Sequence, residues 1–103
     1  MLSLKPGVRV LGLRPEILLF VMAAQAAYAK RGADLVITSG IEGTHSRGSE
    51  HYTGLAVDVR TSNLAPSQVT DVIAELKAAL GPDFDILLED DHLHAEWDPK
   101  DPY

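Results

Sequence analysis

The sequence predicts an α+β domain, in which a small antiparallel or mixed sheet carries two main helices on one side. Two stretches, 15–30 and 66–80, have apolar residues at helical spacing, and five shorter stretches are predicted as β-strands. Helices and strands are mixed along the chain, which favours the α+β class. The length of 103 residues predicts a single domain, 1–103, large enough to fold without disulfide or metal support.

The first part of the chain predicts an extended lead-in over 1–13, with a short strand at Val8–Leu11. A helix is predicted over Pro15–Lys30, because proline suits a first helical turn and Gly32 follows the end of the pattern. We expect this helix to be largely buried, because further apolar residues beside its apolar stripe make that stripe wider. The stripe is Ile17, Val21, Ala24 and Tyr28, and the widening residues are Leu18, Phe20 and Met22.

A central strand is predicted at Leu35–Thr38, where β-branched residues follow one another. The next 16 residues, Ser39 to Gly54, form a glycine-rich polar loop. A loop of this length in so small a domain is more often functional than neutral. The loop leads into a second predicted strand, Leu55–Val59.

A second helix is predicted at Pro66–Leu80, ended by Gly81 and Pro82. Its apolar stripe consists of Val69, Val72, Ile73, Leu76 and Leu80. Two further strands, Phe84–Glu89 and His92–Trp97, are separated by a tight turn at Asp90–Asp91 and predict a hairpin. The tail from Asp98 contains two prolines and is expected at the surface.

Composition excludes several classes of function. The chain has no cysteine, so a disulfide scaffold, a cysteine zinc finger, an iron–sulfur centre and a thiol nucleophile are excluded. Nine basic residues against fifteen acidic ones give a net charge of −6, which argues against nucleic-acid binding. Any metal site must therefore use histidine, aspartate and glutamate, and all four histidines lie between positions 45 and 94.

The longest apolar stretch, Ile17–Ala29, has 13 residues, whereas a membrane span needs about 20. Pro15 and Glu16 before it favour a buried helix over an export signal. We therefore expect synthesis in the cytoplasm without a signal peptide, no insertion into a membrane, and a monomer.

Two polar clusters carry the candidate chemistry, at 49–58 and 89–97. His92 and His94 are two apart on a predicted strand and therefore share a face. Asp58 lies within an apolar strand, where a carboxylate needs a partner or a metal. Catalytic zinc sites use three protein ligands and keep one position open. His51, Asp58 and one histidine of the hairpin would supply such a set.

The pattern Ser-x-His-x-x-Gly-x-Ala-x-Asp, followed by acid-x-x-His near the end of the chain, resembles a known family. It is similar to the zinc D-alanyl-D-alanine carboxypeptidases and peptidoglycan endopeptidases, whose superfamily includes the hedgehog signalling domain. The first motif is complete here, and the segments around Thr38–Gly40 and His94–Trp97 also resemble the family's. The resemblance covers about 35–99 and looks closest to small phage and prophage members. The positions of the first motif are Ser49, His51, Gly54, Ala56 and Asp58.

The resemblance implies a hedgehog/D,D-peptidase-like fold with one Zn²⁺ per chain, held by His51, Asp58 and His94. It implies that Asp91, three residues before the last ligand, is the general base. Ser49 would contact the substrate beside the metal.

Two points stay open within this resemblance. If His92 were the ligand instead, Glu89 would stand three residues before it and would be the base. We favour His94 with Asp91, because the residues after His94 match the family's ending, and His92 would then face the substrate. Family members also often carry an arginine soon after the Ser-Gly. None stands there in this sequence, and Arg47 or His45 is a candidate substitute at the substrate.

We therefore expect a zinc metallopeptidase that cuts a peptide bond in bacterial peptidoglycan, as a D,D-carboxypeptidase or an endopeptidase. It would act on the cell wall, after phage lysis or on a virion. The alternatives are a non-catalytic, hedgehog-like zinc module used for folding or partner binding, and a metal-free binding domain.

Overall fold

The computed structural model describes residues 1–41 and 54–99. Within these ranges two helices and five strands follow one another along the chain. They are β1 (Leu2–Leu4), α1 (Pro15–Lys30), β2 (Leu35–Ser39), β3 (Ala56–Arg60), α2 (Pro66–Leu80), β4 (Phe84–Glu89) and β5 (His92–Trp97).

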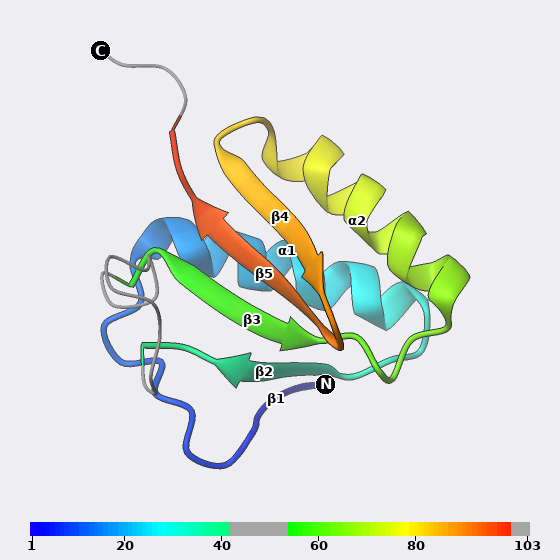
Figure 1. Cartoon of the computed structure of the whole chain (residues 1–103), viewed down its shortest axis with the longest axis horizontal. Helices are drawn as coiled ribbons and strands as arrows, with labels where there is room; N and C mark the ends of the chain where they lie inside the picture. The colour runs from blue at the N-terminus through cyan, green and yellow to red at the C-terminus, as the bar shows by residue number, and fades with distance from the viewer. Residues whose placement is uncertain (42–53, 100–103) are drawn as a thin grey trace.

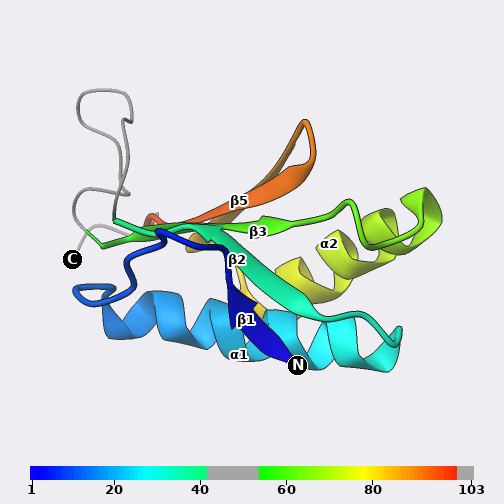
Figure 2. The same cartoon turned by 90° about the horizontal axis from the view of Figure 1, so that it is seen from below.

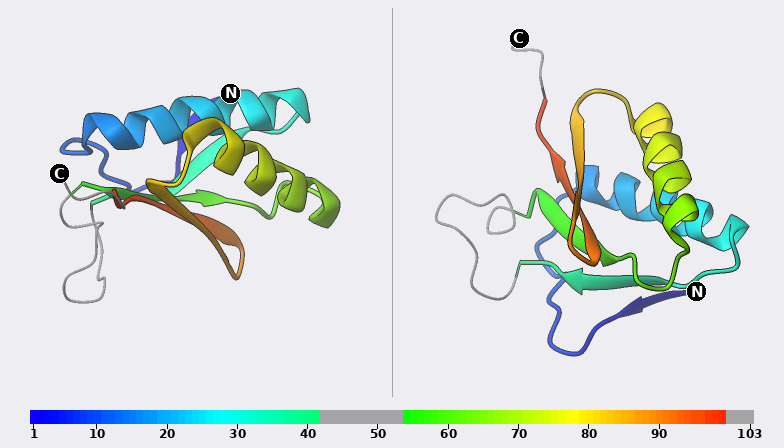
Figure 3. Two further views of the ribbon diagram at one scale, coloured as in Figure 1. Left: turned by 90° about the horizontal axis from the view of Figure 1, so that it is seen from above. Right: turned by 45° about the vertical axis from the view of Figure 1, so that its right-hand side comes forward.

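The strands form one mixed sheet in the order β1-β2-β3-β5-β4 (Figure 1). β1 is parallel to β2, and all other neighbours are antiparallel. Both helices cover the same face of the sheet, which is clear when the molecule is viewed along the sheet (Figures 2 and 3). The predicted α+β class, with a mixed sheet and two helices on one side, is confirmed.

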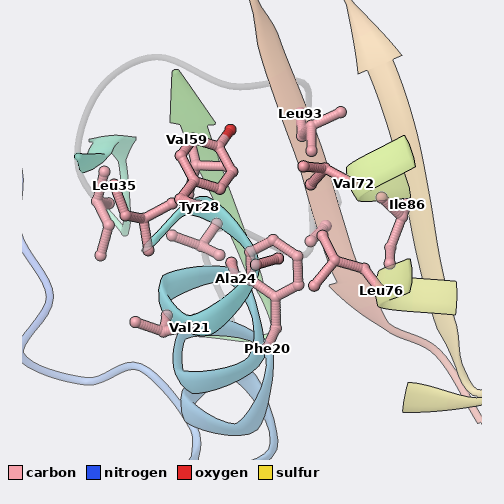
Figure 4. Close-up of a cluster of buried hydrophobic side chains, with 14 of the residues drawn as sticks. Phe20, Val21, Ala24, Tyr28, Leu35, Val59, Val72, Leu76, Ile86 and Leu93 are labelled. Carbon is pink, nitrogen blue, oxygen red and sulfur yellow. The ribbon is translucent and has the colours of Figure 1, made fainter. Parts of the chain in front are cut away.

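The core lies between the helices and this face of the sheet (Figure 4). The burial pattern of β5 alternates, so that every second residue points into the core. Phe20 and Tyr28 of α1 and Leu76 of α2 are completely or almost completely buried there, opposite Val59 and Leu93 of the sheet. Burial of these large side chains supplies the main free-energy gain of folding.

Most of the predicted elements are confirmed. The two helices and the two hairpin strands have the expected bounds, β2 extends one residue further, and β3 is shifted by one residue. The expected strand at Val8–Leu11 is wrong, because the lead-in makes turns there. Val8 N–H donates to Lys5 O and Leu13 N–H to Val10 O, while Leu2–Leu4 pairs with β2 instead.

The expectation that α1 is largely buried is only partly right. Ile17, Phe20 and Ala24 are fully buried, but Leu18 is 49% and Met22 is 69% exposed. The reason is geometric, because the sheet and α2 cover only one side of α1. No helix in the described ranges has the length and apolar character to cross a membrane.

Tyr28 joins α1 to the sheet through a partly buried hydrogen bond. Its hydroxyl donates to the backbone O of Arg60 at 2.6 Å, and its side chain has no exposed surface. Burial raises the pKa of Tyr28 from 10.0 to about 12.

We expect Tyr28→Phe to lower the free energy of unfolding by about 1 kcal/mol at neutral pH, because the Arg60 carbonyl loses its donor. Urea denaturation measures this difference. The wild-type protein should also lose stability at alkaline pH. Because the folded pKa lies above the unfolded one, the contribution of the neutral hydroxyl is complete below about pH 10 and is lost as the pH rises towards about 12.

The Tyr28→Phe variant is its own control for this pH dependence, because it has no hydroxyl to ionise at position 28. The stability difference between the two proteins should shrink between about pH 10 and about pH 12. Two stability curves that run parallel across this range would contradict the role given to Tyr28.

Candidate functional site

The face of the sheet that points away from the helices, here called the outer face, carries the polar clusters. Leu93 and Ala95 of β5 point into the core, so His92, His94 and Glu96 lie on the outer face. Asp58 likewise lies between two core residues of β3. Figure 3 shows that this face has no helix over it.

The pairing of β3 with β5 places Asp58 directly opposite His94. His94 Nδ1 lies 2.9 Å from Asp58 Oδ1, although the two residues are 36 positions apart in the sequence. On its other side Asp58 pairs with Ser39, because the register between β2 and β3 shifts after Ile37. Such irregularities are common beside active sites, where they redirect a side chain.

Asp58 and His94 are both largely shielded, with side chains 13% and 14% exposed. His94 Nε2 lies 2.9 Å from Glu96 Oε1, so the ring is held between two carboxylates. The hydrogen bond to Asp58 is the largest cause that raises the pKa of His94, to about 9. Burial opposes the rise, while Glu96 and the charge of Glu89 add to it. The surrounding carboxylates therefore favour a positive charge on or beside the His94 ring.

His92 lies beside the pair and contacts both candidate bases. Its Nε2 is 3.3 Å from Glu89 Oε1 and 3.8 Å from Asp58 Oδ2. Its Nδ1, on the other side of the ring, is 3.3 Å from Asp91 Oδ1. Glu89 and Asp58 thus share one side of the ring, and Asp91 lies on the other with a side chain that is 83% exposed.

Gly54 and Ala56 show why small residues occupy two positions of the sequence motif. Gly54 has φ +77°, and a Cβ on it would collide with the backbone O of Gly12. Its own carbonyl accepts a hydrogen bond from Arg14 N–H, which fixes the start of β3 against the lead-in to α1. Ala56 is fully buried and pairs with Glu96. These contacts set where β3 begins, and therefore where Asp58 lies.

Four predicted site residues, His45, Arg47, Ser49 and His51, lie outside the described residues. Of the other predicted residues, the structure brings Asp58, Glu89, His92 and His94 together. Asp91 contacts this group through His92.

Asp58 and His94 fit two ligands of a zinc ion. Two ligand atoms on a tetrahedral zinc lie about 3.3 Å apart, given bonds of about 2.0–2.1 Å. Asp58 Oδ1 and His94 Nδ1 are within a few tenths of an ångström of that spacing. Zinc-binding histidines usually donate their other ring N–H to a carboxylate, and Glu96 stands at that position. Because zinc needs a deprotonated ring nitrogen, the metal and a proton would compete for Nδ1.

A second arrangement of possible ligands was not anticipated from the sequence. In the described ranges, the one group of three such side chains with ligand atoms within 4.8 Å of one another is Asp85, Glu96 and Asp98. The predicted hairpin already contains two members of this group, because Asp85 pairs with Glu96 across its strands. Its donors are all oxygens, which suits hard cations better than zinc.

Comparisons with protein-family models, with curated proteins and with solved structures found no match.

The roles of Glu96 and Asp85 can be separated by measuring zinc affinity. We expect Glu96→Gln to weaken zinc binding about 10- to 100-fold, because His94 loses the carboxylate behind its ring. Competition with a chromophoric chelator measures the change. Asp85→Asn is the matched control, because Asp85 belongs to the acidic group, whereas the ring nitrogens of His94 contact Asp58 and Glu96. Equal losses in both variants would instead place the metal in the acidic group.

Proposed function

We propose that the chain is a zinc-dependent peptidase of the hedgehog/D,D-peptidase superfamily that hydrolyses a peptide bond in bacterial peptidoglycan. The observation that carries this proposal is the Asp58–His94 pair, in which two side chains of zinc-binding type are joined at 2.9 Å. The motif in which Asp58 stands, and the His-x-acid-aromatic ending at His94, support the same family. The mixed sheet with both helices on one face is compatible with it.

In this proposal Asp58, His94 and His51 hold one zinc ion. When bound, zinc polarises the scissile carbonyl and lowers the pKa of its water towards about 7. Glu96 keeps the His94 ring oriented, with Nδ1 towards Asp58. The low exposure of Asp58 and His94 strengthens electrostatic interactions between them and any bound cation.

For the general base, the arrangement favours Glu89 over Asp91. Glu89 contacts the ring nitrogen of His92 that also approaches Asp58, and its charge acts on His94. Asp91 contacts the opposite nitrogen and points into solvent. Glu89 would accept a proton from the attacking water and later donate it to the leaving amine. His92 would steady Glu89 on the substrate side of the site.

The remaining proposals concern the substrate. Ser49 would contact the substrate peptide, and Arg47 or His45 would stabilise the developing oxyanion. The protein would act on the cell wall during phage lysis or from a virion.

Removal of zinc should abolish digestion of peptidoglycan, and stoichiometric zinc should restore it. His51→Ala and Asp58→Ala should be inactive, because each removes one of three ligands. The release of soluble muropeptides from purified cell wall measures this activity. Asp71→Ala, an exposed change on α2, is the control and should retain activity. Full digestion by a zinc-free preparation would refute the mechanism.

The two candidate bases can be distinguished by amide variants. We expect Glu89→Gln to lower turnover by about 10²- to 10⁴-fold with its zinc content unchanged, because the proton acceptor is lost. Asp91→Asn should change turnover by less than about tenfold, since it removes only a solvent-exposed contact to His92.

The opposite ranking of the two variants would assign the base to Asp91. A wild-type protein that binds one zinc but releases no muropeptide would contradict the peptidase and favour the non-catalytic zinc module.

A further inference from the structure

Exposed apolar side chains are concentrated at the start of the chain. Among the described residues, ten large hydrophobic side chains are exposed, and eight of them lie within the first 22 positions. We call these eight the N-terminal patch: Met1, Leu2, Leu4, Val10, Leu11, Leu18, Leu19 and Met22. Single exposed apolar residues are ordinary, but a cluster of this kind marks an interaction surface.

Four members of the N-terminal patch line one apolar groove of about 330 Å³. Figure 2 shows β1 crossing beside α1, with the lead-in at one end. Side chains from all three segments line the groove, and they include Leu2 and Leu4 of β1, Val10 and Leu13 of the lead-in, and Leu18 and Val21 of α1. The most exposed members of the patch are Leu11 at 86%, Met1 at 78% and Met22 at 69%.

The N-terminal patch is also the basic part of an acidic chain. The first 22 residues contain three basic side chains and one acidic one, against six basic and fourteen acidic in the remainder. Lys5, Arg9 and Arg14 are exposed, and each directly follows or precedes a residue that lines the groove. An apolar surface with a cationic rim is complementary to an anionic, apolar partner.

A second copy of the chain fits this surface less well. In a two-fold dimer the same patch would face itself, so the rims of both copies would bring their cations together. The exposed side chains also come from a strand, a loop and a helix, and protrude from all three. Such a surface suits a bilayer, into which separate side chains insert.

We propose that the N-terminal patch adsorbs to an anionic membrane surface, with its apolar side chains in the headgroup region and its cations against the lipid phosphates. Each cation near such a surface adds about fivefold to the binding constant. The acidic remainder of the chain would be repelled and would orient away from the bilayer. The outer face of the sheet, which carries Asp58 and His94, points away from α1, so the bilayer would not cover it.

The test uses the whole protein and two kinds of vesicle, phosphatidylcholine alone and an equal mixture with phosphatidylglycerol. We expect co-sedimentation with the mixed vesicles, weak binding to the neutral ones, and loss of binding as salt is raised. Lys5→Gln and Arg14→Gln should each weaken binding about fivefold. Lys77→Gln, the same change on exposed α2, should have no effect.

Apolar variants test the other half of the proposal. Leu11→Ser and Met22→Ser should each weaken binding about tenfold, because an inserted side chain is lost. Leu88→Ser, at a site 53% exposed but outside the patch, is the matched control. Circular dichroism establishes that each variant folds.

Three results would overturn the proposal. They are absence of binding to the mixed vesicles, equal effects of patch and control variants, and a dimer by light scattering that Met22→Ser dissociates. The last would show that a second copy covers the patch. None of these measurements depends on peptidase activity, so the adsorption and the proposed catalytic function can fail separately.

Discussion

The register between β3 and β5 is the constraint on which the candidate site depends. It sets Asp58 opposite His94, and with a one-residue slip Asp58 would point into the core. The core resists such a slip, because Val57 and Val59 of β3 and Leu93 of β5 are completely buried beneath the helices. The packing energy of one face of the sheet therefore fixes the geometry of polar groups on the other. Gly54 contributes at the end of β3, where its backbone closely contacts the lead-in to α1.

Electrostatics on the outer face follow from this register. Asp58 and Glu96 hold the two nitrogens of His94, and Glu89 and Asp91 hold those of His92. Four carboxylates around two imidazoles would repel one another without positive charge among them, so the arrangement favours a protonated ring or a bound cation. The side chains of β5 alternate between the two faces of the sheet. This six-residue strand therefore contributes to the core on one face and to the candidate site on the other.

Much of the fold could be predicted from the sequence, because periodic apolar spacing and the turn residues between elements are local properties. Pairing is not local, and nothing in the pattern of β5 shows that it inserts between β3 and β4. The sequence predicts the first strand at 8–11, because valines there favour extended structure. The turns on either side of these residues outweigh that preference, and β1 forms earlier in the chain. The two motifs identified Asp58 and His94 correctly as neighbours. The proposed choice of Glu89 over Asp91 as the general base rests on their contacts with opposite sides of the His92 ring, which a spacing rule cannot give.

X-ray absorption at the zinc edge can test whether Asp58 and His94 share one zinc ion. We expect a first shell of nitrogen and oxygen at about 2.0–2.1 Å, with the outer-shell scattering of two imidazole rings. His94→Gln should reduce this scattering to that of one ring, while Asp85→Asn should leave it unchanged. A shell of oxygen alone, without imidazole scattering, would place the metal at Asp85, Glu96 and Asp98 and would contradict a zinc ion shared by Asp58 and His94.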